Sequence, residues 1–110
     1  MQTADIPKCI QLDHEGGSCG IVFEPDAEHK CSFPYNAYQW AEGMATEITI
    51  RFNTHRVIIR GQHLESLPEQ LALQKVRWVK VAGRAAGMLS TALNGNAPIV
   101  DEITIEKTRE

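Results

Sequence analysis

The chain has 110 residues, a formal net charge of −3, and 43% hydrophobic and 23% charged residues. These values are typical of one globular domain, which we place at 1–110 with frayed ends at 1–5 and 107–110. No apolar run approaches the ~20 residues that span a bilayer, and no basic-then-apolar leader opens the chain. We therefore expect a cytoplasmic protein without a membrane partner, whose three cysteines are reduced thiols.

The first third of the chain predicts a hairpin followed by a loop. Residues 8–12 alternate apolar with polar side chains and residues 19–23 are apolar, so we expect a hairpin over 8–24. Residues 24–30 are acidic and contain a proline, which is typical of a surface loop. The aromatic stretch 32–40 could form one short helical turn that packs as a plug against the end of a sheet.

The clearest pattern lies in the middle of the chain. Apolar side chains alternate with polar ones over 47–52 and again over 56–60, and the short polar segment Asn53–His55 separates the two runs. Period-two alternation places the apolar side chains on one face of each strand. The sequence therefore predicts an antiparallel hairpin over 46–61.

A helix and further strands are predicted after this hairpin. Ser66 and Glu69 have the spacing of a capping box, so we expect a helix that starts there and stops near Lys75. Strands are expected over 76–81 and 99–105, the last at a sheet edge. Residues 88–93 could form a short helix or belong to a mobile loop, and the order of 83–98 stays open. The fold class that follows is α+β: an antiparallel sheet of about five strands, formed by two hairpins and later strands, packed against one main helix.

The net charge conceals an uneven distribution along the chain. Residues 1–45 and 85–110 are acidic, whereas 46–84 carry seven Lys or Arg against three Glu. The acidic ends could fold against the basic centre, which is the reading we favour. Alternatively, Arg51, Arg56 and Arg60 could share the polar face of the central hairpin and bind a polyanion or nucleic acid.

The leading functional hypothesis is a non-enzymatic domain that binds a protein partner or self-associates. No catalytic constellation stands out, and Ile58 interrupts the polar face of the central hairpin, so that face is expected to be covered. Together with Trp78 and Tyr38, Ile58 could form an apolar patch rimmed by arginine, a composition favoured at interfaces. Which face of the hairpin is covered is left open.

Metal binding and nucleophilic catalysis are weaker hypotheses, and no cofactor is expected. The weak candidate metal ligands are Cys9, Cys19, His29 and Cys31, which lack the close pairing usual in zinc sites. From the sequence alone, Cys19 with His14 nearby is the best candidate for a nucleophile and its base.

Overall fold

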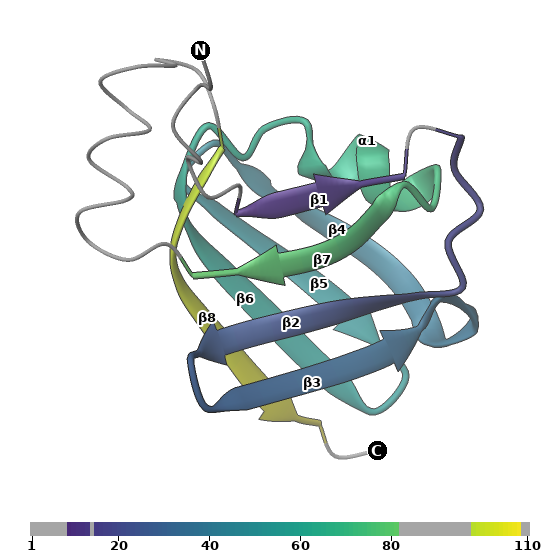
Figure 1. Cartoon of the computed structure of the whole chain (residues 1–110), viewed down its shortest axis with the longest axis horizontal. Coiled ribbons are helices and arrows are strands. Elements are labelled where there is room, and N and C mark those ends of the chain that lie inside the picture. The colour runs from purple at the N-terminus through teal and green to yellow at the C-terminus, as the bar shows by residue number, and fades with distance from the viewer. Residues whose placement is uncertain (1–8, 14, 82–97, 109–110) are drawn as a thin grey trace, which may run out of the picture.

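The structure is a computed structural model that describes residues 9–13, 15–81 and 98–108. Its strands form two four-stranded sheets (Figure 1). The first sheet has the order β1 (Ile10–Leu12), β7 (Val76–Lys80), β2 (Gly20–Asp26) and β3 (His29–Pro34). The second has the order β4 (Tyr38–Met44), β5 (Glu47–Phe52), β6 (His55–Gln62) and β8 (Ile99–Lys107). The predictions for 1–5 and 88–93 lie outside the described residues.

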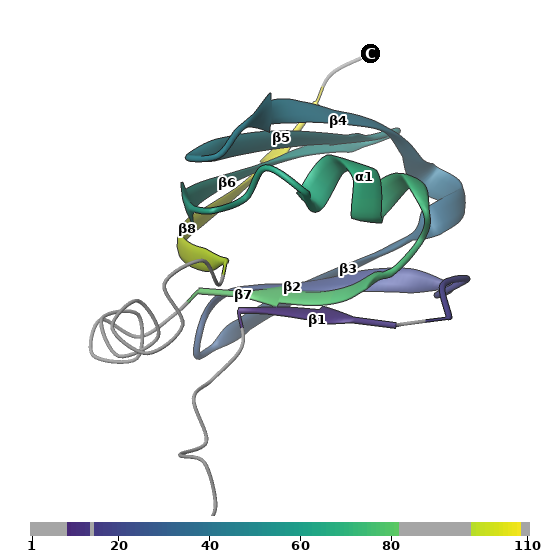
Figure 2. The same cartoon turned by 90° about the horizontal axis from the view of Figure 1, so that it is seen from above.

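The predicted fold class is wrong, because the described chain is mostly β and has no main helix. The two sheets face each other as layers, and the short helix α1 (Leu67–Ala72) lies between them on one side (Figure 2). The inner faces of both sheets supply the core. An α+β domain would bury one sheet against a helix, whereas here each sheet buries its apolar face mainly against the other.

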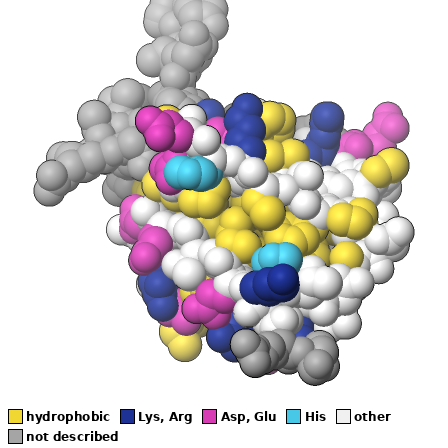
Figure 3. Space-filling view, turned by 90° about the horizontal axis from the view of Figure 1, so that it is seen from below, with side chains coloured by type: hydrophobic (Ala, Val, Ile, Leu, Met, Phe, Trp, Pro, Cys, Tyr) yellow, Lys and Arg dark blue, Asp and Glu magenta, His cyan; other side chains and the backbone are white. Residues whose placement is uncertain are grey.

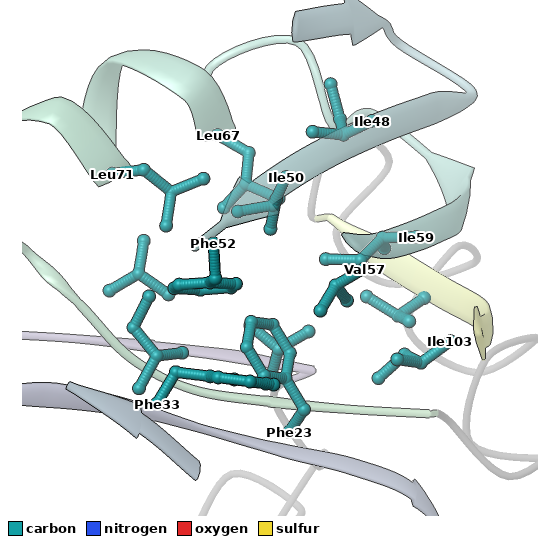
Figure 4. Close-up of a cluster of buried hydrophobic side chains, with 14 of the residues drawn as sticks. Phe23, Phe33, Ile48, Ile50, Phe52, Val57, Ile59, Leu67, Leu71 and Ile103 are labelled. Carbon is teal, nitrogen blue, oxygen red and sulfur yellow. The ribbon is translucent and has the colours of Figure 1, made fainter. Parts of the chain in front are cut away.

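Aromatic and branched side chains from both layers fill the space between them (Figure 4). Phe33 of the first sheet stacks on Phe52 of the second, with ring centroids 4.3 Å apart. Phe23 meets both rings edge-on, at 6.0 and 6.1 Å. Such ring pairs add about 0.5–1.5 kcal/mol each beyond the area that they bury, so this cluster is a strong link between the two sheets.

The central hairpin is confirmed as predicted. β5 and β6 pair antiparallel, with Glu47 opposite Arg60 and Arg51 opposite Arg56. The apolar positions of both strands are buried: Ile48, Ile50, Phe52, Val57 and Ile59. β8 extends this sheet as an edge strand, as the sequence predicted.

The predicted hairpin over 8–24 is wrong, although its two strands exist. β1 pairs antiparallel with β7, and β2 pairs parallel with β7, so a strand from far along the chain separates them. β2 instead forms its hairpin with β3, which covers part of the segment expected to be a loop. The turn between them is short because Asp26 Oδ1 accepts a hydrogen bond from the Glu28 amide at 2.8 Å, an Asx-type turn.

The helix is shorter than predicted and lacks the predicted capping box. α1 ends at Ala72, and the Ser66 side chain forms no capping hydrogen bond. Leu67 and Leu71 do share its buried face, as expected. At its end Gln74 takes a positive φ of 57°, and the Lys75 amide donates to the Gln70 carbonyl oxygen at 2.9 Å. This Schellman-type ending turns the chain into β7.

A single 3-10 turn carries the chain from the first sheet to the second. η1 (Tyr35–Ala37) follows Pro34 and leads directly into β4. The buried Tyr35 hydroxyl donates to the Val76 carbonyl oxygen at 2.6 Å, and the Tyr35 amide donates to the Cys19 carbonyl oxygen at 2.9 Å. The turn that the aromatic segment predicted is therefore present, and it anchors the start of β4. No helix in the described residues is long and apolar enough to cross a membrane.

Candidate protein-interaction surface

The outward face of the second sheet is built from three cross-strand rows of side chains. Directly opposed residues of antiparallel strands point to the same side of a sheet. The register therefore defines the rows, which are Met44–Glu47–Arg60–Glu102, Glu42–Thr49–Ile58–Thr104 and Trp40–Arg51–Arg56–Glu106. We call these twelve residues the outer face. It brings together four of the residues singled out in the sequence: the three arginines and Ile58.

The arginines of the outer face lie among carboxylates. Arg56 forms an ion pair with Glu106 at 2.5 Å. Arg60 pairs with Glu47 at 3.2 Å and with Glu102 at 3.3 Å, and the Glu47 hydrogen bond raises the pKa of the Arg60 guanidinium. Arg51 donates from Nε to the Phe52 carbonyl oxygen at 3.0 Å. Basic residues from the centre of the chain thus pair with acidic residues from its C-terminal part.

This pairing weakens the case for a polyanion site. The outer face carries three arginines and four glutamates, so its net charge is −1. A surface that holds phosphates by charge needs a net positive potential. Binding through Arg51, Arg56 and Arg60 stays a prediction, and no feature of the described structure favours it.

Ile58 lies in the middle row of the outer face. Its cross-strand neighbours are Thr49 and Thr104, and it is half-buried. The charged residues of the two flanking rows are mostly exposed, so no described element packs over this face. The cover that Ile58 predicts for this face is therefore not supplied by any described part of the chain.

The exposed hydrophobic side chains of this face lie on β4. Trp40 is 44% exposed and Met44 is 68% exposed. Both point outward from β4, Trp40 in one flanking row and Met44 in the other. Their neighbours across the strand pair are Arg51 and Glu47. The sequence predicted that Trp40 belongs to an aromatic plug packed against the end of a sheet, whereas Trp40 lies exposed on β4. The strand period could have found it, because once 38–44 is read as a strand, Trp40 falls on the same side as Glu42 and Met44.

β4 is also the least protected of the four edge strands in the described structure. β1 is three residues long, β3 carries a lysine and ends in proline, and β8 carries four charged residues. Short length, charge and proline all discourage pairing with another chain. β4 has seven residues and one charge, Glu42, which forms no ion pair with another described residue. A bulge beside Tyr38 and Trp40 confines its regular stretch to the part that follows.

Trp78 does not belong to the outer face. It lies on β7, opposite Gln11 and Val22, and points outward from the first sheet. Its indole Nε1 donates to the Glu24 carboxylate, and the Lys30 ammonium lies 5.5 Å from its ring. These contacts make Trp78 part of a polar cluster on the opposite side of the molecule from Ile58.

Tyr38 also lies apart from Ile58 and Trp78. It is half-buried, at the start of β4, and its ring packs edge-on against Tyr35 and Phe52, at 6.3 and 6.2 Å. Burial raises the pKa of its hydroxyl. Ile58 and Trp78 thus lie on the outward faces of different sheets, and Tyr38 packs against core rings, so the three do not form one continuous patch.

A second apolar area lies where the sheets part, between the edges β3 and β8. Hydrophobic side chains form a band on this side of the molecule (Figure 3). The hydrophobic side chains of β3 and β8 include Cys31 and Ile105, which are half-buried, and Phe33 and Ile103, which are buried. These side chains belong to the core, and none of them is as exposed as Trp40 or Met44.

The described structure does not gather the cysteines and histidines of the metal hypothesis. Cys9 is buried, and its Sγ accepts a hydrogen bond from the Val100 amide at 3.3 Å, whereas Cys19 is exposed. His29 Nδ1 forms a hydrogen bond with Asp26 Oδ1 at 2.8 Å. Among the residues described, no group of three or more potential ligands could hold a metal ion. His14, the partner suggested for Cys19, lies outside them.

Comparison with known proteins adds no assignment. No protein family matches the chain, and neither a curated protein nor a solved structure matches it.

Proposed function

We propose that this chain is a protein-interaction domain, binding rather than catalysing, and that it binds through β4 and the adjoining outer face. One observation carries the proposal: Trp40 and Met44 are both exposed on the outward side of an edge strand. Tryptophan and methionine are enriched at interfaces, and tryptophan is among the residues that carry most of the binding energy there. This replaces the patch of Ile58, Trp78 and Tyr38. Of the three, Ile58 alone lies on the outer face, while Tyr38 begins β4 but packs half-buried against Phe52.

The position of these residues indicates a mode of binding. An edge strand has backbone N–H and C=O groups that face outward and can pair with an added strand. Main-chain hydrogen bonds would supply affinity, while the outward side chains would select the partner. Trp40 and Met44 lie four residues apart, so they and Glu42 between them would meet alternate side chains of that strand.

Ile58 would extend this surface across the sheet. It lies in the same row as Glu42, two strands from the edge. The ion pairs on either side of it leave few unpaired charges to desolvate. An apolar centre with paired charges at its margin resembles the usual division of an interface into core and rim.

Site-specific photo-crosslinking in the cells that produce the protein tests the proposal. A photoactivatable residue at position 40 should yield a defined covalent adduct with a protein. The control places the same residue at position 77, because Arg77 is exposed on β7 in the other sheet. Adducts at 40 but not at 77 are expected. The absence of any adduct at 40, or equal adducts at both positions, would overturn the proposal.

A further inference from the structure

Resting on the proposed function, we infer that the segment which adds to β4 is a basic extended strand. It would place a Lys or Arg side chain opposite Glu42, and apolar side chains opposite Trp40 and Met44. Residues opposite each other across a strand pair share a face, and their side chains alternate with period two. The segment is therefore expected to read apolar, x, basic, x, apolar along the regular stretch of β4.

Glu42 is the one charge in the middle row of the outer face. The row continues from Glu42 to Thr49, Ile58 and Thr104, so it holds no cation. Glu42 is exposed and forms no ion pair with another described residue. Because β4 is an edge strand, the remaining position beside Glu42 is the one that an added strand fills. Opposite charges that face each other across a strand pair are favourable, so a cation there would complete the row.

The flanking rows need no further charge. Trp40 lies in the row that continues to Arg51, so a cation opposite Trp40 would approach a like charge. Met44 lies in the row of Glu47, whose carboxylate is already paired with Arg60 at 3.2 Å. Apolar side chains opposite Trp40 and Met44 would instead cover the two exposed hydrophobic residues of this edge.

Carboxylates also lie on the α1 side of this edge. The Leu64 amide donates to the Ala45 carbonyl oxygen at 2.9 Å, which fixes the segment that enters α1 beside the turn after β4. Glu65 follows directly, and Glu69 lies in the first turn of α1, which packs beside β4. Both are exposed, and neither forms an ion pair with another described residue. Since neither β4 nor the segment 61–74 contains Lys or Arg, the fixed charges along this edge are all negative.

This charge distribution selects among the occupants that an edge strand can take. An acidic strand, or a second β4, would bring further carboxylates to an edge that has no cation of its own. A basic strand meets opposite charge both across from Glu42 and on the α1 side. The whole chain carries a net charge of −3, so a cationic segment is also attracted at longer range.

NMR titration of the labelled full chain with synthetic peptides is the test. The probe is the acetylated and amidated peptide Thr-Val-Lys-Arg-Lys-Val-Thr, which carries arginine between two valines on one face. The matched peptides replace its three cations with Gln or with Glu and keep the valines. We expect the basic peptide to shift the amides of 40–44, the neutral one to bind about fivefold more weakly or worse, and the acidic one to bind weakest. No shift of 40–44 by the basic peptide, or equal binding of the basic and neutral peptides, would overturn the inference.

A single isosteric substitution ties the preference to β4. Glu42→Gln should raise the dissociation constant of the basic peptide about two- to fivefold, because one opposite-charge pair across the strands is lost. It should leave binding of the neutral peptide unchanged. Glu28→Gln is the matched control, since Glu28 is exposed at the turn between β2 and β3, and it should change neither constant. An equal effect of the two substitutions on the basic peptide would contradict a cation opposite Glu42.

The outcomes separate this inference from the proposed function. If position 40 crosslinks to a protein but the basic peptide does not shift 40–44, the proposed function stands and the basic segment is wrong. If the peptide binds as expected but position 40 yields no adduct in cells, the proposed function fails, and the inference fails with it. If the chain alone forms a dimer that shifts the same amides as its concentration rises, the occupant is a second copy and the inference is overturned.

Discussion

The hydrogen bond of Tyr35 gives a prediction that changes sign with pH. Tyr35 is 6% exposed, and its hydroxyl donates to the Val76 carbonyl oxygen at 2.6 Å. This bond ties η1, the turn between the two sheets, to β7 of the first sheet. Tyr35→Phe removes this bond and little else. A neutral intramolecular hydrogen bond is worth about 1 kcal/mol net. At pH 7 the variant should lose about that much free energy of unfolding.

The order of stability should reverse in alkali. Burial raises the pKa of Tyr35 from 10.0 to about 12. Above pH 10 the unfolded chain loses this proton while the native state keeps it, so the stability that the protonated hydroxyl contributes is complete below pH 10 and lost between pH 10 and 12. Two pKa units correspond to about 2.7 kcal/mol. This loss exceeds the hydrogen bond, so the phenylalanine variant should be the more stable one at pH 12.

Urea unfolding followed by circular dichroism at pH 7, 9, 10, 11 and 12 measures both effects. Other groups that titrate in this range are common to the two proteins and cancel in the difference. Tyr38→Phe is the control at pH 7, because the Tyr38 hydroxyl makes no hydrogen bond to another described residue and its removal should cost less. Unfolding free energies of Tyr35→Phe and wild type that run parallel from pH 9 to pH 12 would refute the reasoning.

Two further predictions concern the packing of the strands and of the thiols. A Cβ at Gly61 would lie 1.8 Å from the Ile99 carbonyl oxygen, so Gly61→Ala must push β6 and β8 apart and should cost at least about 3 kcal/mol in urea unfolding. Gly17→Ala, whose Cβ would meet nothing within 4 Å but whose φ is 78°, should cost only about 1 kcal/mol, and an equal cost at both sites would contradict the contact. Brief alkylation with peptide mapping should label exposed Cys19 and spare Cys9, whose burial raises its thiol pKa; equal labelling would count against the burial.

The sequence predicted those elements whose stability is local. The hairpin of β5 and β6 shows regular alternation on both strands and a short polar turn, and its register needs no distant partner. The buried face of α1 followed from the spacing of Leu67 and Leu71. The final strand was found for the same reason, because Ile103 and Ile105 alternate with polar residues.

The architecture could not be read in the same way, because it depends on pairing between distant segments. β7 inserts between β1 and β2, and no local pattern indicates that strand 76–80 separates two strands near the N-terminus. β3 and β4 were missed because their side chains alternate weakly: β3 holds a lysine and a proline, and a bulge interrupts β4. Because β4 was not predicted, the predicted sheet lacked one of its edge strands. The predicted helix was therefore expected to cover more of the core than α1 covers.

The candidate site also divides into features that local patterns predict and features that depend on pairing between distant strands. Alternation placed Arg51, Arg56, Arg60 and Ile58 correctly on one polar face. It could not show that Glu102 and Glu106 line up beside those arginines, since that requires the register of β8. Nor could it assign Trp78 to the other sheet.

Hydrogen–deuterium exchange tests the central claim, binding at the edge of β4, most directly. The full chain would be compared as a dilute monomer and in its associated form, whether with a second copy or with a protein crosslinked at position 40. Slower exchange confined to the amides of 38–44, with β3 and β8 unchanged, is the result that this account predicts. Protection at the edges β3 or β8, with the amides of 38–44 exchanging as fast as before, would contradict it.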